Sequence, residues 1–396
     1  MLTFPFLSPR KIARIGREDL DARLSNAASA EVELAGDWAA IEAQLPSNWR
    51  ELGPAHGVDL AASPPQAKVR DLGVLLRLVF FHVGANASLA TTTAIAAAAN
   101  LITMSAVALH LWMTKLGPYI EALLTAMTDT ARQFAAEKWA GYQIFIVDAT
   151  TVTRPGAKGT TARVHYALRL ADLHPVQVDV TDEKGGETLR RFVKHAGLGQ
   201  LWLGDRCYAN PPGIAALVGV GADVLVRWNR GSLPLFDLLG ERIDLRERMV
   251  NLVEGVVREW TVWIQPEDQQ PIMGRICAVR LPADKAEEAR VRLRREQGAD
   301  ITSETLECAE FVVVFTTVPP SVFSSEVVLE LYQLRWQVEL SIKRDKSLAG
   351  LDRLPNFRPD TIRTWILAKM LLTQIAHKIS TTEVCVPPCA PCARAA

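Results

Sequence analysis

The sequence has no excess of charge of either sign. Lys and Arg together number 44 and so do Asp and Glu, which gives a net charge of zero. A protein that binds an acidic polymer must then concentrate its positive charge locally. The most basic long stretch runs from Arg335 to Lys378, with nine Lys or Arg against four Asp or Glu. Neutrality therefore neither favours nor excludes a nucleic-acid partner.

The chain also lacks a good secretory signal and a clear membrane span. Its first residues, MLTFPFLSPRKIARIG, have a short apolar segment that precedes the basic residues, the reverse of a signal peptide. Residues 83–109 contain no Asp, Glu, Lys or Arg, so a span has to be considered. Gly, Asn, Thr and Ser are too frequent there to support one. We expect a cytoplasmic protein with no membrane partner.

Cysteine is scarce, with six residues in the chain. The three in the body of the sequence are scattered and predicted to be reduced, and three crowd the tail: Cys207, Cys277 and Cys308, then Cys385, Cys389 and Cys392. The tail spacing, C-x3-C-x2-C, is a partial zinc pattern without a clear fourth ligand, although His377 could complete it. The spacing is too weak to predict a zinc site.

The 396 residues exceed what one domain usually contains, and their 49% apolar and 22% charged content is ordinary for a globular protein. Residues 1–138 are rich in Ala and Leu and are predicted to be helical. Within them, two helices are expected around a turn near Asn100, the second capped by Ser105. Such a pair is either a helix-turn-helix that binds a DNA groove or a structural hairpin.

From Tyr142 the pattern changes to that of an α/β domain. YQIFIVDATTV is an apolar, β-branched run with Asp148 near its end, and LWLGD is a buried strand whose end presents Asp205. Two strands and a crossover helix are expected between these two runs, and a helix and a strand after Asp205. Either Asp alone could simply end a strand and cap a turn.

The gap from Asp205 to Glu339 is 134 residues, too long for one connection in a compact domain. We therefore predict a β-rich insertion at 230–317. Residues 139–229 and 318–350 then form the α/β domain, and 351–396 form a C-terminal helix and an irregular tail.

The most informative stretch is LYQLRWQVELSIKRDK, residues 331–346. Ser324 and Ser325 can cap a helix that begins just before it, and no Gly or Pro follows until Gly350. On a single helix, the four residues of the pattern Y-x2-R-x3-E-x6-K lie in one narrow stripe: Tyr332, Arg335, Glu339 and Lys346. The ordinary alternative is a solvated helix in which Arg335 and Glu339 form an i,i+4 pair.

This pattern resembles the signature of the DDE transposases of the IS-four family of bacterial insertion sequences. The motif G-D-R-x-Y at 204–208 matches the family's second-Asp motif, although Cys207 stands where many relatives carry a small residue, commonly Gly. The resemblance implies a ribonuclease-H-like catalytic domain with a β-rich insertion and a helical, DNA-binding N-terminal domain. It implies that Asp148, Asp205 and Glu339 are the catalytic metal ligands, and that DNA is bound by Tyr332, Arg335, Lys346 and Arg206.

The chemistry agrees with this resemblance. Phosphodiester cleavage needs an activated nucleophilic oxygen and a neutralised leaving oxygen, and a pair of divalent ions can do both. Mg²⁺ prefers carboxylate and water oxygens, so three acids suit it, with Mn²⁺ as a possible substitute. Arg335 and Lys346 suit DNA phosphates.

By resemblance, the protein binds the terminal inverted repeats of its element, cuts, forms a hairpin and transfers the strands into target DNA. Two alternatives remain open: a metal-dependent nuclease of the same fold, and a catalytically silent DNA-binding inhibitor of transposition. We expect a homodimer on DNA, joined through the apolar helix at 361–379, unless that helix packs back onto its own chain. In relatives an aromatic residue of the insertion stacks on a flipped base. Phe311 is the nearest candidate here, with burial in the core the favoured alternative.

Overall fold

The fold is taken from a computed structural model. It describes residues 38–62, 68–129, 139, 141–171, 174–267, 269–297, 301–347, 349–352, 354 and 359–383. The three tail cysteines, and with them the zinc hypothesis, lie outside the described residues.

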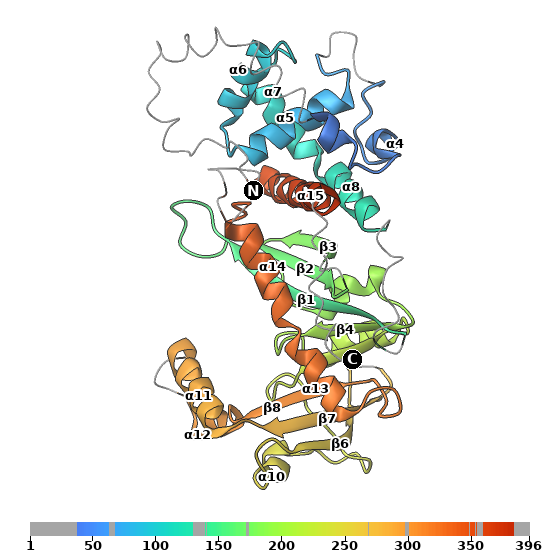
Figure 1. Cartoon of the computed structure of the whole chain (residues 1–396), viewed down its shortest axis with the longest axis vertical. Coiled ribbons are helices and arrows are strands. Elements are labelled where there is room, and N and C mark those ends of the chain that lie inside the picture. The colour runs from blue at the N-terminus through green and yellow to red at the C-terminus, as the bar shows by residue number, and fades with distance from the viewer. Residues whose placement is uncertain are drawn as a thin grey trace, which may run out of the picture.

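Helices form the N-terminal part of the described chain, as the sequence predicts (Figure 1). They are α4 (Trp49–Ala55), α5 (Leu72–Gly84), α6 (Leu89–Ala98), α7 (Ala106–Lys115) and α8 (Gly117–Asp129). The predicted pair around Asn100 is confirmed as α6 and α7, because Asn100 has a φ of 50° in the turn between them. Ser105 caps α7 as predicted, since its side chain accepts the Ala108 N–H.

The uncharged run at 83–109 is divided among three short helices. It contains the end of α5, the whole of α6 and the start of α7. Across the described ranges, no helix combines the length and the apolar character that a membrane crossing requires.

A large mixed sheet follows these helices (Figure 1). Its strands in the described part are β1 (Gln143–Val152), β2 (Ala162–Arg169), β3 (His174–Thr181), β4 (Gln200–Gly204), β5 (Asp223–Arg227), β6 (Val257–Ile264), β7 (Ile272–Arg280) and β8 (Phe311–Thr316). They lie in the order β3-β2-β1-β4-β5-β8-β7-β6.

The sheet has two parts that differ in strand direction. β1, β2 and β3 form an antiparallel meander, and β4 and β5 run parallel to β1. Beyond β5, the strands β8, β7 and β6 are each antiparallel to their neighbour. The strands of the predicted insertion at 230–317 therefore continue the same sheet, with β8 hydrogen-bonded directly to β5.

Helices connect and cover the strands. They are η2 (Leu189–His195), α9 (Pro211–Val218), α10 (Leu245–Met249), α11 (Ala283–Gln297), α12 (Ser303–Cys308), α13 (Ser325–Gln333), α14 (Trp336–Ser347) and α15 (Pro359–Glu383). The predicted crossover helix after β3 is the 3₁₀-helix η2, seven residues long. Short connecting segments of this kind often adopt 3₁₀ geometry.

The two faces of the sheet belong to two cores. Ile144 and Ile146 of β1 join a core shared with the N-terminal helices and α15. Phe145 and Val147, whose side chains alternate with these, join a core with η2 and α9. There the rings of Phe145 and Trp202 stack with centroids 4.7 Å apart. Because β1 is covered on both faces, its apolar run is nearly continuous.

The C-terminal helix α15 lies between the N-terminal helices and the sheet (Figure 1), against α5, α7, α8 and β3. Its large apolar residues are at most 1% exposed: Trp365, Ile366, Leu367, Met370, Leu371 and Ile375. The prediction that this helix presents them to a second subunit is therefore wrong for the chain alone, and the alternative, packing onto its own chain, is what the structure shows. Removing this apolar surface from water stabilises the packing of α15 onto its own chain.

The predicted single helix through the Y-x2-R-x3-E-x6-K stretch is also wrong. Ser324 caps α13 as predicted, but Leu334 and Arg335 form a turn between α13 and α14. The N–H of Arg335 bonds to the carbonyl of Tyr332 at 3.1 Å, an i→i−3 bond tighter than that of an α-helix. Tyr332 and Glu339 therefore lie on separate helices, although Arg335 in the turn still pairs with Glu339.

Phe311 begins β8 and is 8% exposed. The guanidinium of Arg280 lies 5.8 Å from its ring centroid. Phe311 is thus a core residue, as the favoured alternative states.

Candidate active site

Asp148 lies inside β1 rather than at its end, opposite Tyr166 of β2. Its carboxylate accepts the Ala149 N–H at 2.8 Å, and its side chain is 17% exposed. Burial raises the pKa of Asp148 to about 6; the Ala149 N–H opposes this, and the charge of Asp205 adds to it. A displaced carboxyl pKa is typical of functional sites, because metal-binding and catalytic acids are often buried together.

Asp205 directly follows β4, the parallel neighbour of β1. Ile146 is paired with Leu203, so the residues two positions further along, Asp148 and Asp205, reach the same edge of the sheet. The Asp205 carboxylate accepts the Cys207 N–H at 2.8 Å, which fixes the turn. Gly204 is required just before it, since a Cβ there would lie 2.8 Å from the Cβ of Tyr208.

Glu339 is connected to Asp148 through Arg335. One guanidinium nitrogen lies 3.8 Å from the Asp148 carboxylate, and the other lies 2.5 Å from the Glu339 carboxylate. Arg335 therefore bridges the strand acid and the helix acid, and the charge of Glu339 contributes to the raised pKa of Asp148. The turn between α13 and α14 is what carries Arg335 to this position.

The other predicted DNA-binding residues surround this bridge in different ways. Lys346, near the end of α14, donates to the Thr151 carbonyl of β1 at 3.1 Å. Tyr332 is 8% exposed, and burial raises the pKa of its hydroxyl. Arg206 is exposed in the turn after Asp205. The structure thus leaves more of Arg206 and Lys346 than of Tyr332 accessible to a ligand.

Two residues near Asp205 were not among the predicted site residues. Over the described ranges, one set of three potential metal ligands has all its ligand atoms within 4.8 Å of one another: Glu187, Asp205 and Cys207. Asp148, Asp205 and Glu339 do not meet that criterion. Glu187 comes from the irregular segment before η2 and forms an ion pair with Arg163 at 3.2 Å. No strand end or motif marks Glu187 in the sequence, whereas Cys207 stands out by replacing a small residue.

The donor set fits a hard divalent cation. Asp148, Asp205 and Glu339 offer only carboxylate oxygens, the ligands that Mg²⁺ prefers. The three carboxylates are close enough to repel one another, because the negative charges of Asp205 and Glu339 raise the pKa of Asp148 beyond the effect of burial. A bound cation would remove that repulsion.

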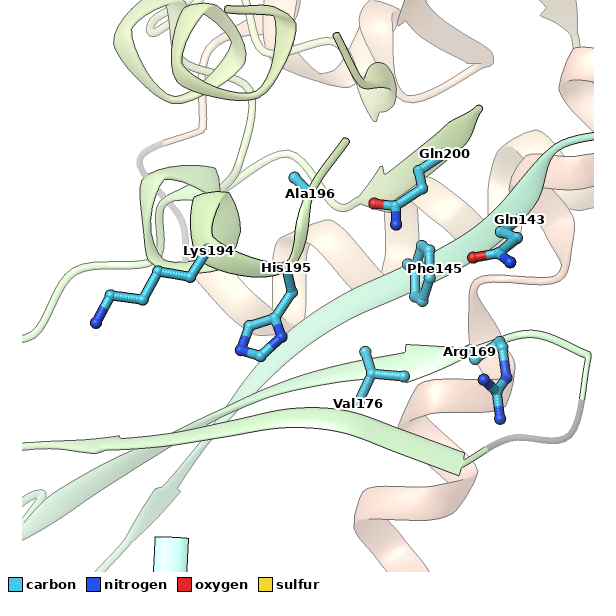
Figure 2. A pocket seen from close by; sticks show the side chains of 8 residues that line it. All are labelled: Gln143, Phe145, Arg169, Val176, Lys194, His195, Ala196 and Gln200. Carbon is cyan, nitrogen blue, oxygen red and sulfur yellow. The ribbon is translucent and has the colours of Figure 1, made fainter. Parts of the chain in front are cut away.

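The described cavities lie at the other edge of the same strands. Gln143 and Gln200, the first residues of β1 and β4, line a cavity of about 280 Å³ together with Lys194 and His195 (Figure 2). A neighbouring cavity of about 420 Å³ is lined by Glu121, Arg363 and Gln374 among others. The acids therefore do not line either cavity.

Comparison with known proteins decides which family has this arrangement. Residues 139–375, more than half of the chain, match the family model described as Transposase DDE domain. The chain belongs to the DDE transposase family. This confirms the resemblance seen in its motifs, and the matched segment includes all three acids.

Individual relatives agree. A putative transposase, InsL, for the insertion sequence element IS186A of Escherichia coli (strain K12) is 30% identical over 329 residues, 81% of this chain and 88% of the relative. The transposase for insertion sequence element IS421 of Escherichia coli is 30% identical over 330 residues, with the same coverage. The protein is thus a DNA transposase of an insertion-sequence family, an enzyme that cleaves DNA and transfers strands.

Proposed function

We propose that this transposase has a ribonuclease-H-like catalytic domain in which Asp148, Asp205 and Glu339 hold Mg²⁺. The observation that carries the proposal is the pairing of β1 with β4, which brings two aspartates to one sheet edge, together with the Arg335 bridge that joins Glu339 to Asp148. The order β3-β2-β1-β4-β5, with an antiparallel meander followed by two parallel strands, supports the fold. Bound Mg²⁺ supplies charge stabilisation for the attacking and leaving oxygens.

The chain's own residues would orient the DNA. Arg335 holds Glu339 toward β1, and its planar guanidinium can bind two oxygens of a phosphate. Tyr332 lies near Arg335, which lowers the pKa of the Tyr332 hydroxyl against the effect of burial. Tyr332 is accordingly proposed to orient Arg335 as well as to contact the cut end. Lys346 and Arg206 would bind phosphates on either side.

The N-terminal helices are proposed to bind the ends of the element, the terminal inverted repeats. On α7, Val107 and Leu111 are 68% and 54% exposed, four residues apart on one helix face. Apolar side chains of this kind contact thymine methyl groups in the major groove.

Assembly on DNA is proposed to involve two copies of the chain, one for each end of the element. Because α15 is buried in its own chain, the contact between copies must come from another surface. The chain is proposed to be a monomer in free solution and to pair only on DNA. Light scattering with and without end DNA tests this, and a stable dimer without DNA would contradict it.

The decisive experiment incubates the full-length protein with linear DNA that carries one inverted repeat, with Mg²⁺ or with EDTA. A nick followed by a hairpin, and then a joined product when target DNA is added, would support the proposed steps. Cleavage without joining would indicate a nuclease, and binding without cleavage would indicate a silent inhibitor. Mn²⁺ in place of Mg²⁺ should restore activity.

A further inference from the structure

We propose that Glu187, Asp205 and Cys207 form a second cation site, for a thiophilic divalent ion of the Zn²⁺ class, beside the transposase's catalytic acids. Binding at this site does not depend on the proposed metal triad. Its consequence for cleavage does rest on the proposed function, because Asp205 is shared by both sites.

The geometry of the site is held from several directions. The carboxylate oxygens of Glu187 and Asp205 and the sulfur of Cys207 all lie within 4.8 Å of one another. The turn after β4 fixes two of these residues, since the Cys207 N–H donates to the Asp205 carboxylate at 2.8 Å. From β2, Arg163 holds Glu187 at 3.2 Å. The ligands therefore come from two separate parts of the chain that the fold brings together.

The donor set selects the ion. Two carboxylates and a thiolate are usual ligands of Zn²⁺, whereas Mg²⁺ and Ca²⁺ prefer oxygen alone. A thiolate favours softer ions such as Zn²⁺ and Cd²⁺. Three protein ligands leave a fourth tetrahedral position for water. On binding, the Cys207 thiol releases its proton to solvent.

A second observation concerns Tyr208, the residue that follows Cys207 in the chain. Tyr208 is fully buried, and its hydroxyl is without a hydrogen-bond partner in the described part of the chain. Burial raises the pKa of this hydroxyl, and the charge of Glu187 is the strongest of the neighbouring charges that add to it. A buried hydroxyl needs a hydrogen-bond partner. A water molecule bound to the cation would provide one.

The consequence is inhibition. Asp205 cannot bind the Zn²⁺-class ion together with Cys207 and at the same time bind the catalytic Mg²⁺ in an unchanged position. A Zn²⁺-class ion should therefore lower Mg²⁺-dependent cleavage by occupying Asp205.

The test is a Cd²⁺ titration of the full-length protein, read by the ultraviolet absorbance of the cadmium–thiolate bond. The three tail cysteines are replaced by Ser in every variant, because they could bind Cd²⁺ themselves. In this background we expect one equivalent of Cd²⁺ to produce the band. Cys207→Ser should abolish it, and Glu187→Gln should weaken binding at least about tenfold, as loss of a supporting group at a metal site typically does.

Cys308→Ser is the matched control, and it should leave the band unchanged. Persistence of the band in Cys207→Ser, or equal affinity in Glu187→Gln, would overturn the site. If Cys207→Ser fails to fold by circular dichroism, Cys207→Gly replaces it and must lose the band. Tyr208→Phe should also weaken binding; no change in affinity would overturn the role of its hydroxyl.

A second measurement separates this site from the proposed function. Inhibition by Zn²⁺ is expressed relative to each variant's own cleavage rate in Mg²⁺ alone. We expect the Zn²⁺ concentration for half inhibition to rise at least about tenfold in Cys207→Ser. Absence of any cleavage by the unaltered protein would contradict the proposed function and leave the absorbance result standing. Unchanged inhibition would contradict the consequence drawn for Asp205.

Discussion

The two ends of the parallel strands β1 and β4 carry different kinds of side chains. At the carboxyl ends, Asp148 and Asp205 share an edge with the Arg335 bridge. At the amino ends, Gln143 and Gln200 line a cavity of about 280 Å³ (Figure 2). In this enzyme the acids and the cavities thus lie at opposite edges. A site that acts on a long polymer needs an accessible edge more than an enclosed cavity, whereas a small-molecule site is usually concave.

The balance of positive and negative side chains also differs between the two edges. Near the cavities two cations meet two acids: Arg191 lies 2.9 Å from Asp179, and Arg363 lies 2.8 Å from Glu121 and 3.6 Å from Asp179. At the carboxyl edge, Arg335 is shared between two acids, and the pKa of Asp148 is raised to about 6, chiefly by burial. Ion pairs that neutralise each other are typical of structural surfaces, and an acid left in excess is typical of a metal site.

The largest expected effect comes from the acids. Asp148→Asn, Asp205→Asn and Glu339→Gln should each lower end cleavage by at least about 10³-fold, because metal-held charge contributes several kcal/mol to the transition state. End binding should stay within about threefold in a mobility-shift assay. Asp179→Asn, a carboxylate near the cavities, is the control and should keep cleavage within about threefold. A variant that keeps full cleavage would remove its residue from the site.

Arg335→Ala should separate the steps of the reaction. Hairpin formation is expected to fall about 10²-fold, the usual cost of one lost transition-state donor, while nicking falls less than about tenfold. Single-turnover assays on end DNA would resolve both products. Arg191→Ala is the matched control variant, because the Arg191 and Arg335 side chains are 21% and 20% exposed. Equal loss of both steps would assign Arg335 to folding or binding instead.

Two glycines near β4, Gly204 at its end and Gly197 three residues before its start, give a comparison of stability. Gly204→Ala should cost about 1–3 kcal/mol of unfolding free energy, since its Cβ would lie 2.8 Å from the Cβ of Tyr208. Gly197→Ala, where a Cβ meets nothing within 4 Å, should be neutral or stabilising by up to about 1 kcal/mol. Urea unfolding measures both. Equal destabilisation would show that the carboxyl edge is no more constrained than the amino edge.

The last effect is a pH dependence of stability without metal. Because the pKa of Asp148 is raised to about 6 in the folded chain, the folded state binds the proton more tightly than the unfolded state. The stabilisation that protonated Asp148 gives the folded state is therefore fully present below about pH 4. It is lost as the pH rises to about 6, which lowers the free energy of unfolding by about 2–3 kcal/mol. Asp148→Asn should lack this loss. Melting curves in EDTA from pH 4 to 7 that superimpose for both proteins would contradict the assignment.

Much of the chain's organisation is local and could be predicted from the sequence. Ser105 and Ser324 cap helices because a side-chain oxygen next to a helix start satisfies free N–H groups wherever the chain goes. Asp205 ends a buried strand because an apolar run stops there. The motifs around Asp205 and Glu339 identify the family, since they record chemistry that needs those residue types.

What only the tertiary structure decided depends on contacts between distant residues. The break at Leu334 and Arg335 carries no Gly or Pro, and β8 pairs with β5 across a long stretch of sequence. The burial of α15 could not be distinguished from an intersubunit contact, because an apolar helix face is the same in both cases. Glu187 reaches Cys207 and Asp205 only because η2 packs beside α9. Local patterns fix where each element begins and ends, whereas partners far apart in the chain are chosen by packing of the whole.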